Sequence, residues 1–301
     1  MNPITKETYA RVTAPMVGQS DLPWRILCRR YGATLTCKLL DNVVLLPLHV
    51  LTDTQMFIAE KLLRDEEYRC SHLFDLETGW TAPLGRPVVA QLAGNDPDTV
   101  LSAAKIIEPF CDAVSTSPLS RHTGALDLNR NQIDLNLGCP QDHAKEGHYG
   151  GYLILAKRDW PRIKAIGESD DLQLPSPVGY LTLDLTVSNL SSNLSIPIHV
   201  KLRLCNPPSL TPSLAVLLAR AGASVVTLHA RHVASRHRRK GAAELKWVQA
   251  VKSAILEESG LEDVVVLSNG NVRTHKDCEK NLRETGADGV MVGEALLGNP
   301  R

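Results

Sequence analysis

Short apolar runs alternate with amphipathic segments along most of this 301-residue chain, and this alternation constrains its fold more than any other feature. Such a pattern is typical of parallel strands joined by helices. The seven clearest runs are predicted strands: residues 12–16, 88–92, 133–137, 198–202, 225–229, 264–268 and 289–292. An eighth strand is predicted near Leu35. Helices are predicted over residues 23–31, 99–108, 212–221, 245–259 and 274–285.

Eight strand–helix units that close on themselves would form an α/β fold of the (β/α)8 TIM-barrel class, which we predict for residues 11–301. Residues 1–10 are a predicted N-terminal extension. In that fold the functional side chains lie at the carboxyl ends of the strands. Polar residues do end the apolar runs here, as at Gln91, Asn136 and Lys201. The alternative is a doubly wound open sheet, although no GxGxxG motif follows the first strand.

Three irregular insertions interrupt the pattern, at residues 37–55, 114–132 and 172–193. They are rich in Ser, Thr, Asn and Leu without a steady period, so we predict loops. Unstructured loops longer than roughly 12–15 residues are uncommon in compact domains. Two explanations are open. The insertions are either true surface loops or translated introns, because codons for Val114-Ser115 and Gln132 can match splice donor and acceptor signals. The second insertion directly precedes the fourth predicted strand. An alternative to a normally placed strand is therefore that this insertion displaces it.

The charges and cysteines restrict the class of partner and compartment. Thirty-three basic and thirty-three acidic residues cancel, so any nucleic acid must be attracted by a local patch. Seven cysteines without CxxC spacing favour a reducing compartment and no metal site. Residues 1–7 show no apolar segment of the kind found in a signal peptide, and no run reaches the roughly 18 apolar residues of a membrane span. We expect a soluble monomer in the cytoplasm, with the nucleus as a second location and no membrane contact.

Two glycine-containing turns predict a phosphate site. Asn269-Gly270-Asn271 follows the seventh strand, and Gly293-Glu294 follows the eighth. The loops after strands seven and eight form the usual phosphate site of such barrels, where main-chain N–H groups bind the anion. A single Asn-Gly pair is most often only a turn. Two such turns on adjacent strands are a more specific signal.

Three side chains at other strand ends suit a flavin. Lys201, if it faces inward, would be buried without a partner unless it met an anion. Gln91 has an amide that both donates and accepts hydrogen bonds, as the edge of a heteroaromatic ring requires. His229 has the matching place on the sixth strand, although a single histidine there is more often structural. With the phosphate site, these residues outline a flavin cofactor.

Cys139 lies between Gly138 and Pro140 in a turn just past the fourth predicted strand. A thiol with an ordinary pKa of roughly 8.5 stays protonated at neutral pH and can donate a proton. The alternative is an inert packing cysteine, which suits Cys28 and Cys111 better because they lie inside apolar helical patterns. We therefore predict that Cys139 is a catalytic acid.

Six motifs resemble the tRNA-dihydrouridine synthase family, in order along residues 14–300 and interrupted by the three insertions. They are APMVGQSD (14–21), VAQLAG (89–94), NLGCPQ (136–141), GHYGG (147–151), SNG (268–270) and GEA (293–295). The NLGCP motif is the most specific of them. Within the family, the chain is most similar to the eukaryotic branch that acts on uridines 16 and 17 of the tRNA D-loop.

The resemblance implies a set of ligands and a reaction. FMN would be bound by Pro15, Met16, Val17, Gln91, Lys201, His229, Asn269, Gly270, Asn271, Gly293 and Glu294. NADPH would reduce the flavin, the flavin would pass hydride to C6 of a tRNA uracil, and Cys139 would protonate C5 to give 5,6-dihydrouridine. The base must leave its stack to reach the flavin. The basic run at residues 231–240 would contact tRNA phosphates, with a solvated loop as the alternative.

The resemblance also implies a difference from relatives, which continue into a last barrel helix and a helical tRNA-binding domain. This sequence stops at Arg301, so we expect a barrel that is incomplete at its C-terminus, without that domain. Two other functions are open. One is an FMN barrel oxidoreductase acting on a small molecule of the dihydroorotate or enoate type, and the other is a truncated inactive product. The Gly-Cys-Pro turn and the basic run favour tRNA.

Overall fold

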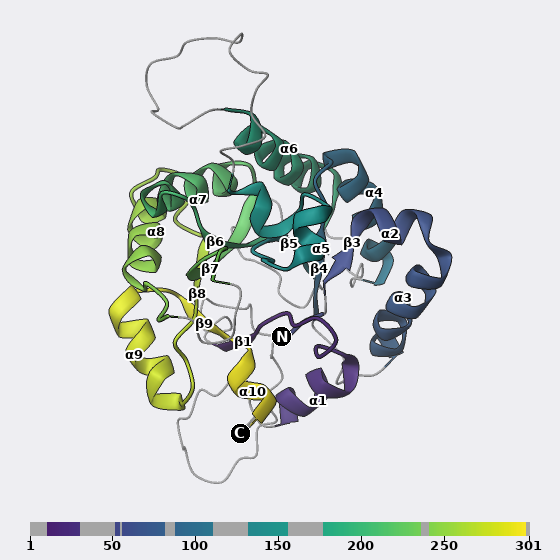
Figure 1. The fold of residues 1–301 in the computed structure, drawn as a ribbon, viewed down its shortest axis with the longest axis horizontal. Helices are drawn as coiled ribbons and strands as arrows, with labels where there is room; N and C mark the ends of the chain where they lie inside the picture. The colour runs from purple at the N-terminus through teal and green to yellow at the C-terminus, as the bar shows by residue number, and fades with distance from the viewer. Residues whose placement is uncertain are drawn as a thin grey trace.

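The structure, a computed structural model, describes residues 11–30, 52–54, 56–81, 88–110, 132–155, 177–235 and 241–298. In these ranges, helices surround a ring of parallel strands (Figure 1). The strands are β1 (Arg11–Thr13), β2 (Thr52–Asp53), β3 (Phe57–Ile58), β4 (Val88–Ala93), β5 (Gln132–Leu137), β6 (Ile198–Leu204), β7 (Ala223–His232), β8 (Val265–Asn269) and β9 (Gly289–Val292). None of the helices in these ranges has the length and apolar character needed to cross a bilayer.

The helices include both predicted and unpredicted segments. They are α1 (Leu22–Arg30), α2 (Ala59–Arg64), α3 (Glu66–Thr81), α4 (Pro97–Ile107), α5 (Asp142–Glu146), α6 (Pro177–Asn193), α7 (Thr211–Arg220), α8 (Lys246–Leu256), α9 (His275–Thr285) and α10 (Glu294–Gly298). The five predicted helices are confirmed as α1, α4, α7, α8 and α9, with ends shifted by no more than three residues. The short 3-10 turns are η3 (Glu108–Phe110), η5 (Gly150–Leu153) and η6 (Pro208–Leu210).

The strands close into a barrel. They pair in the order β2-β1-β9-β8-β7-β6-β5-β4-β3, and β2 also pairs with β4, so the ring has no gap. β2 pairs with the beginning of β4 and β3 with its end, so together they form one strand position in two pieces. With β2 and β3 counted as one, the described residues form eight parallel strand positions, as a TIM barrel requires. A doubly wound sheet has two free edges, and that alternative is excluded.

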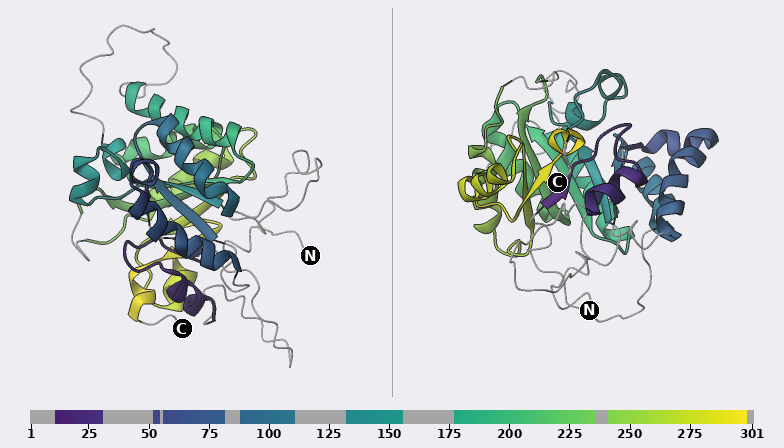
Figure 2. Two further views of the ribbon diagram at one scale, coloured as in Figure 1. Left: turned by 90° about the vertical axis from the view of Figure 1, so that its right-hand side faces the viewer. Right: turned by 90° about the horizontal axis from the view of Figure 1, so that it is seen from below.

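The two ends of the described chain meet in the barrel wall. β1 pairs with β9 in register, with Val12 opposite Met291. Figure 2 accordingly shows the first segments, in purple, beside the last ones, in yellow. Inside the wall, Val12, Val89 and Leu267 belong to one buried apolar cluster. The strands have continuous apolar sequences because helices cover their outer face and other side chains cover their inner face.

The second strand position differs from the prediction. Leu35 lies outside the described residues, and β2 lies inside the insertion predicted at residues 37–55. Each of β2 and β3 is two residues long, and buried Thr54 lies between them. Pieces this short do not produce an apolar run, so the pattern gave no signal for them.

Helix α6 contradicts the loop that was predicted at residues 172–193. Its buried residues Leu183, Val187 and Leu190 recur at intervals of four and three, which is the period of one helix face. That face packs toward α4 on the outside of the barrel (Figure 1). The prediction was wrong because Ser, Thr and Asn residues between the apolar positions obscure the stripe.

Strand β5 is not displaced by the insertion before it. Residues 114–131 lie outside the described residues, and Gln132 begins the strand. β5 lies between β4 and β6, with Asp134 opposite Gln91 and Asn136 opposite Lys201. Cys139 therefore follows a correctly paired strand at the carboxyl end of the barrel.

A buried ion pair fixes α8 against the strands. The Nζ atom of Lys252 donates to the two carboxylate oxygens of Asp288 at 2.8 and 2.7 Å. One of those oxygens also accepts the main-chain N–H of Val266 at 2.8 Å. Both charged side chains are only 10% exposed, so each depends on the other for compensation of its charge.

Candidate active site

A cavity of about 1190 Å³ lies at the carboxyl ends of the barrel strands. Segments at or after β1, β4, β5, β6, β7, β8 and β9 line it. All twelve residues predicted from the sequence as the site are among those lining it: Pro15, Met16, Val17, Gln91, Cys139, Lys201, His229, Asn269, Gly270, Asn271, Gly293 and Glu294. The fold thus brings the predicted set together, while the part each residue plays stays a prediction.

The charged lining of the cavity is mostly basic. Lys201, Arg203, Arg231 and Arg273 line it, and Glu294 is the one acidic residue among the described lining residues. Burial and the neighbouring Arg231 lower the pKa of Arg203 to about 10, so its guanidinium keeps its charge at neutral pH. A concave site with this balance attracts anions, although the chain as a whole has no net charge.

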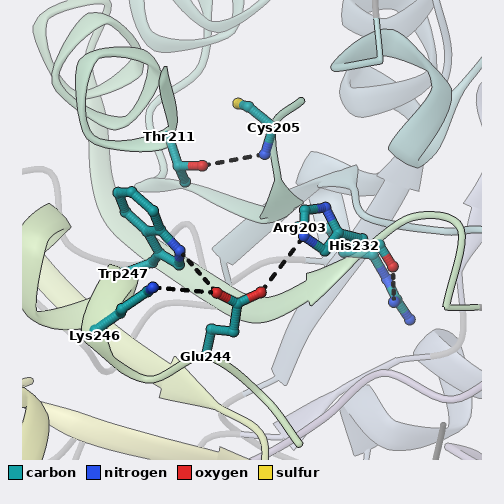
Figure 3. Close-up of polar contacts among 7 residues, drawn as sticks. All are labelled: Arg203, Cys205, Thr211, His232, Glu244, Lys246 and Trp247. Atoms are coloured by element: carbon teal, nitrogen blue, oxygen red, sulfur yellow. Dashed lines mark hydrogen bonds and ion pairs between the residues drawn. The ribbon is translucent and has the colours of Figure 1, made fainter. Parts of the chain in front are cut away.

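Arg203 is held from behind by the end of β7. Its Nη1 atom donates to the main-chain oxygen of His232 at 3.0 Å. The His232 ring lies 3.5 Å from Oε1 of Glu244, and Oε2 of that carboxylate accepts from the Trp247 indole (Figure 3). Sequence reasoning missed Arg203, although it shares a strand face with Lys201 two residues earlier.

His229 is a neutral acceptor in this cluster. Burial, followed by the charges of Lys201, Arg203 and Arg231, lowers its pKa well below the ordinary value. Its Nε2 atom lies 3.0 Å from Nη1 of Arg231, so the guanidinium donates to the imidazole. Arg231 also donates to Oδ1 of Asn271 at 3.3 Å. Of the predicted basic run, Arg231 therefore lines the cavity, while residues 236–240 lie outside the described residues.

The turns after β8 and β9 have tight backbone requirements. Gly270 has φ of 129°, and a Cβ there would lie 2.6 Å from Cβ of Ala243. Asn271, with φ of 58°, bonds both the N–H and the C=O of Ala243 at 2.8 Å through its amide. At Gly293 a Cβ would lie 3.2 Å from Cβ of Ala14. The glycines therefore allow these turns to pack closely against Ala243 and Ala14, where a side chain would clash.

An amide network forms part of the cavity wall. Gln91 donates from Nε2 to Oδ2 of Asp134 at 2.6 Å, and its Oε1 accepts from Asn136 at 2.7 Å. Oδ1 of Asn136 then accepts the N–H groups of Gly138 and Cys139 at 3.0 and 2.8 Å. One amide oxygen and one amide proton of Gln91 are thus already engaged within the protein, which limits what it can offer a ligand.

Asp134 is the buried carboxyl group of that network, and sequence reasoning missed it. Burial raises its pKa to about 7, against the smaller lowering effects of the Gln91 hydrogen bond and the Lys201 charge. The signal was present in the alternation Ile133-Asp134-Leu135-Asn136-Leu137, which puts both polar residues on one face of the strand.

We expect Asp134 to make stability depend on pH. Because its folded-state pKa is raised, the folded protein binds the proton more tightly, so the free energy of unfolding falls as pH rises from about 4 to about 7. The slope from one group is at most about 1.4 kcal/mol per pH unit. Urea unfolding of Asp134→Asn across this range should lack that contribution. Parallel pH profiles for the variant and the unaltered chain would contradict the assignment.

Cys139 is held tightly in its turn. It is 9% exposed, and its main-chain oxygen accepts the N–H of Gly151 at 2.9 Å. Gly150 has φ of 64°, and a Cβ there would lie 2.9 Å from Cβ of Cys139. The motif Gly150-Gly151 therefore makes room for the thiol-bearing turn.

The electrostatics around Cys139 favour the protonated thiol. Burial raises its pKa, while the N–H of Gln141 and the charges of Lys201 and Arg203 lower it by less. The thiol is therefore protonated at neutral pH, as the function of a proton donor requires.

The match to a protein family rests on parts of the barrel outside the turn of Cys139. A family model described as dihydrouridine synthase (Dus) matches residues 12–115 and 182–301. The chain belongs to the dihydrouridine synthase family. The range between the two matched segments contains β5 and the turn of Cys139, so the family match and the Cys139 motif are separate observations.

Alignments with curated relatives cover nearly the whole chain. It is 32% identical to the tRNA-dihydrouridine(16/17) synthase, NAD(P)(+), of Schizosaccharomyces pombe, covering 97% of the chain and 56% of that protein. Identity to the protein of that name from Saccharomyces cerevisiae is 31%, covering 96% of the chain and 53% of the relative. For a like-named mouse protein it is 30%, covering 96% and 46%. The chain spans about half the length of these relatives.

Proposed function

We propose that this dihydrouridine synthase uses FMN and NADPH to reduce a D-loop uridine of tRNA to 5,6-dihydrouridine, with Cys139 as the proton donor. The observation that carries the proposal is the meeting of a protonated thiol and a basic cavity at the carboxyl ends of the barrel strands. The relatives named for NAD(P) and for uridines 16 and 17 support the choice of donor and substrate.

The residues present fit FMN. At one side of the cavity, Gly270, Asn271 and Gly293 offer main-chain groups, with the Arg231 guanidinium beside them, as a phosphate requires. Elsewhere in the cavity, Lys201 and the buried amide network offer polar groups of the kind that a flavin ring needs. A site for one small ligand typically has roughly 300–1,000 Å³, so about 1190 Å³ leaves room for a cofactor and a base.

The chain's own residues supply the remaining chemistry. FMN bound here would be reduced by NADPH and would supply the hydride for C6 of the uracil. Lys201 provides a positive charge that stabilises the negative charge of a reduced cofactor. Cys139 delivers its proton to C5, and Asn136 holds the turn from which it does so. The uridine must leave its stack to enter the cavity, so Arg273 and Arg231 are candidate contacts for the flanking phosphates.

One experiment tests the proposal against its alternatives. The purified chain should carry flavin absorbance, and the gene should restore dihydrouridine to tRNA of cells that lack the corresponding enzyme. Failure to restore it, with flavin bound and NADPH oxidised only by a small enoate or by orotate, would instead favour the small-molecule oxidoreductase. Absence of bound flavin would favour an inactive product.

A further inference from the structure

The imidazole of His143 contacts the thiol of Cys139 but does not line the cavity. The Sγ atom lies 3.9 Å from Nε2 of His143, which stands four residues later in α5. His143 is exposed to solvent, whereas Cys139 is 9% exposed. Among the described residues, those that line the cavity do not include His143. The imidazole therefore connects the thiol with solvent by a path other than the cavity.

The proposed function, on which this inference rests, requires such a path. When C5 of uracil takes the proton, the S–H bond breaks, its electron pair stays on sulfur, and a thiolate remains. The thiolate must gain a proton before the next turnover. With a cofactor and a base in the cavity, a residue that is already 9% exposed has little direct access to water.

We propose that His143 returns a proton to Cys139 after each turnover. An N–H bond of the imidazolium breaks, its electron pair stays on nitrogen, and the S–H bond forms. The neutral imidazole then takes a proton from water or a buffer acid at its exposed edge. One hydride from NADPH and one solvent proton are thus consumed for each dihydrouridine. A separation of 3.9 Å is long, but such contacts commonly shorten when charge develops on the acceptor.

The other titratable groups that face Cys139 are less suited to this step. Tyr149 of the neighbouring turn has its pKa raised to about 12, mainly by burial, so it keeps its proton. Arg203 also keeps its proton, with a pKa of about 10. Lys201 faces the thiol from β6 and lines the cavity, where bound ligands would separate it from solvent. Only His143 of this set is both in contact with Sγ and outside the cavity.

The test compares first and later turnovers of His143→Asn. In an anaerobic single turnover, prereduced enzyme is mixed with an unmodified tRNA transcript and flavin reoxidation is followed. This rate constant should stay within about twofold of the unaltered chain, because the thiol starts protonated. In steady state with saturating NADPH, kcat should fall by about a hundredfold, the low end of what proton transfer by a positioned side chain contributes. Added imidazole should restore it.

Lys145→Asn is the matched control, since Lys145 is an exposed basic residue of the same short helix that does not line the cavity. It should leave both rates unchanged. Equal slowing of the first and later turnovers in His143→Asn, without rescue by imidazole, would mean that His143 only supports the turn. Unchanged steady-state turnover would also overturn the proposal.

A second measurement uses neither tRNA nor NADPH. Alkylation of Cys139 by iodoacetamide, followed against pH by mass spectrometry of its peptide, reports the thiol pKa. Loss of the imidazole removes a hydrogen-bond donor that stabilises the thiolate, so His143→Asn should shift the profile to higher pH and Lys145→Asn should not. Coincident profiles would rule out the pair. If the unaltered chain made no dihydrouridine, the proposed function would fail while this readout still tested the Cys139–His143 contact.

Discussion

Under the proposed function, Cys139→Ala is expected to retain bound flavin and to form dihydrouridine at least about a hundredfold more slowly, because proton transfer by a positioned acid typically contributes that much or more. The thiol contacts the main-chain N–H of Gln141 and, at 3.9 Å, the His143 ring, and the turn itself is held by main-chain groups that alanine retains. Flavin absorbance of the purified variant and nucleoside analysis of treated tRNA measure the two effects separately.

The control is Cys70→Ala, which makes the same change at an exposed cysteine of α3. It should match the unaltered chain in both flavin content and rate. If Cys139→Ala lost its FMN, Cys139 would be a structural residue, and if it kept its full rate, another group would be the acid.

Lys252→Met is expected to lower the free energy of unfolding by about 3–5 kcal/mol, because it leaves the Asp288 carboxylate buried without its cation. The midpoint of urea unfolding, measured at neutral pH, reports the loss. A change of this size is a large part of the total stability of a typical domain.

Two further variants separate charge from packing. Lys246→Met removes an exposed ion pair, with the lysine 69% exposed, and should cost less than about 1 kcal/mol. The double variant Lys252→Met/Asp288→Asn removes the buried charge yet keeps an oxygen for the N–H of Val266, so it should recover most of the stability. A double variant no more stable than Lys252→Met would mean that lost packing, not the unpaired charge, causes the effect.

Much of this barrel was predictable because its strands are buried on both faces. β4 is the clearest example, since all six of its residues are buried and its sequence is almost entirely apolar. β2 could not be found in this way, because its two residues hold their place by pairing with β1 and β4 and not by an apolar pattern. α3 was missed because its sixteen residues carry no steady apolar stripe, so tertiary contacts and not periodicity define it.

The site was predictable where a residue type has a chemical reason to end a strand. Gln91, Lys201 and the Asn269–Asn271 turn were recognisable for that reason, and the fold brings them to one cavity. Asp134 was not recognisable, because its importance depends on its contact with Gln91 of another strand. His143 was not recognisable either, because its contact with Cys139 depends on helix α5, which begins after the turn. A buried aspartate is interpretable only when its amide partner on the adjacent strand is known.

The closure of the barrel through β2 has a consequence for how the molecule opens. β6 and β7 are seven and ten residues long and pair along most of their length, whereas β2 offers two residues to close the ring. Local unfolding takes place where few hydrogen bonds must break. We therefore expect amide hydrogens around β2 to exchange with deuterium through local fluctuations, and those of β6 and β7 only when the domain unfolds globally. The barrel would then open first into a curved sheet, in which β8 and β9 still hold the turns that follow them side by side.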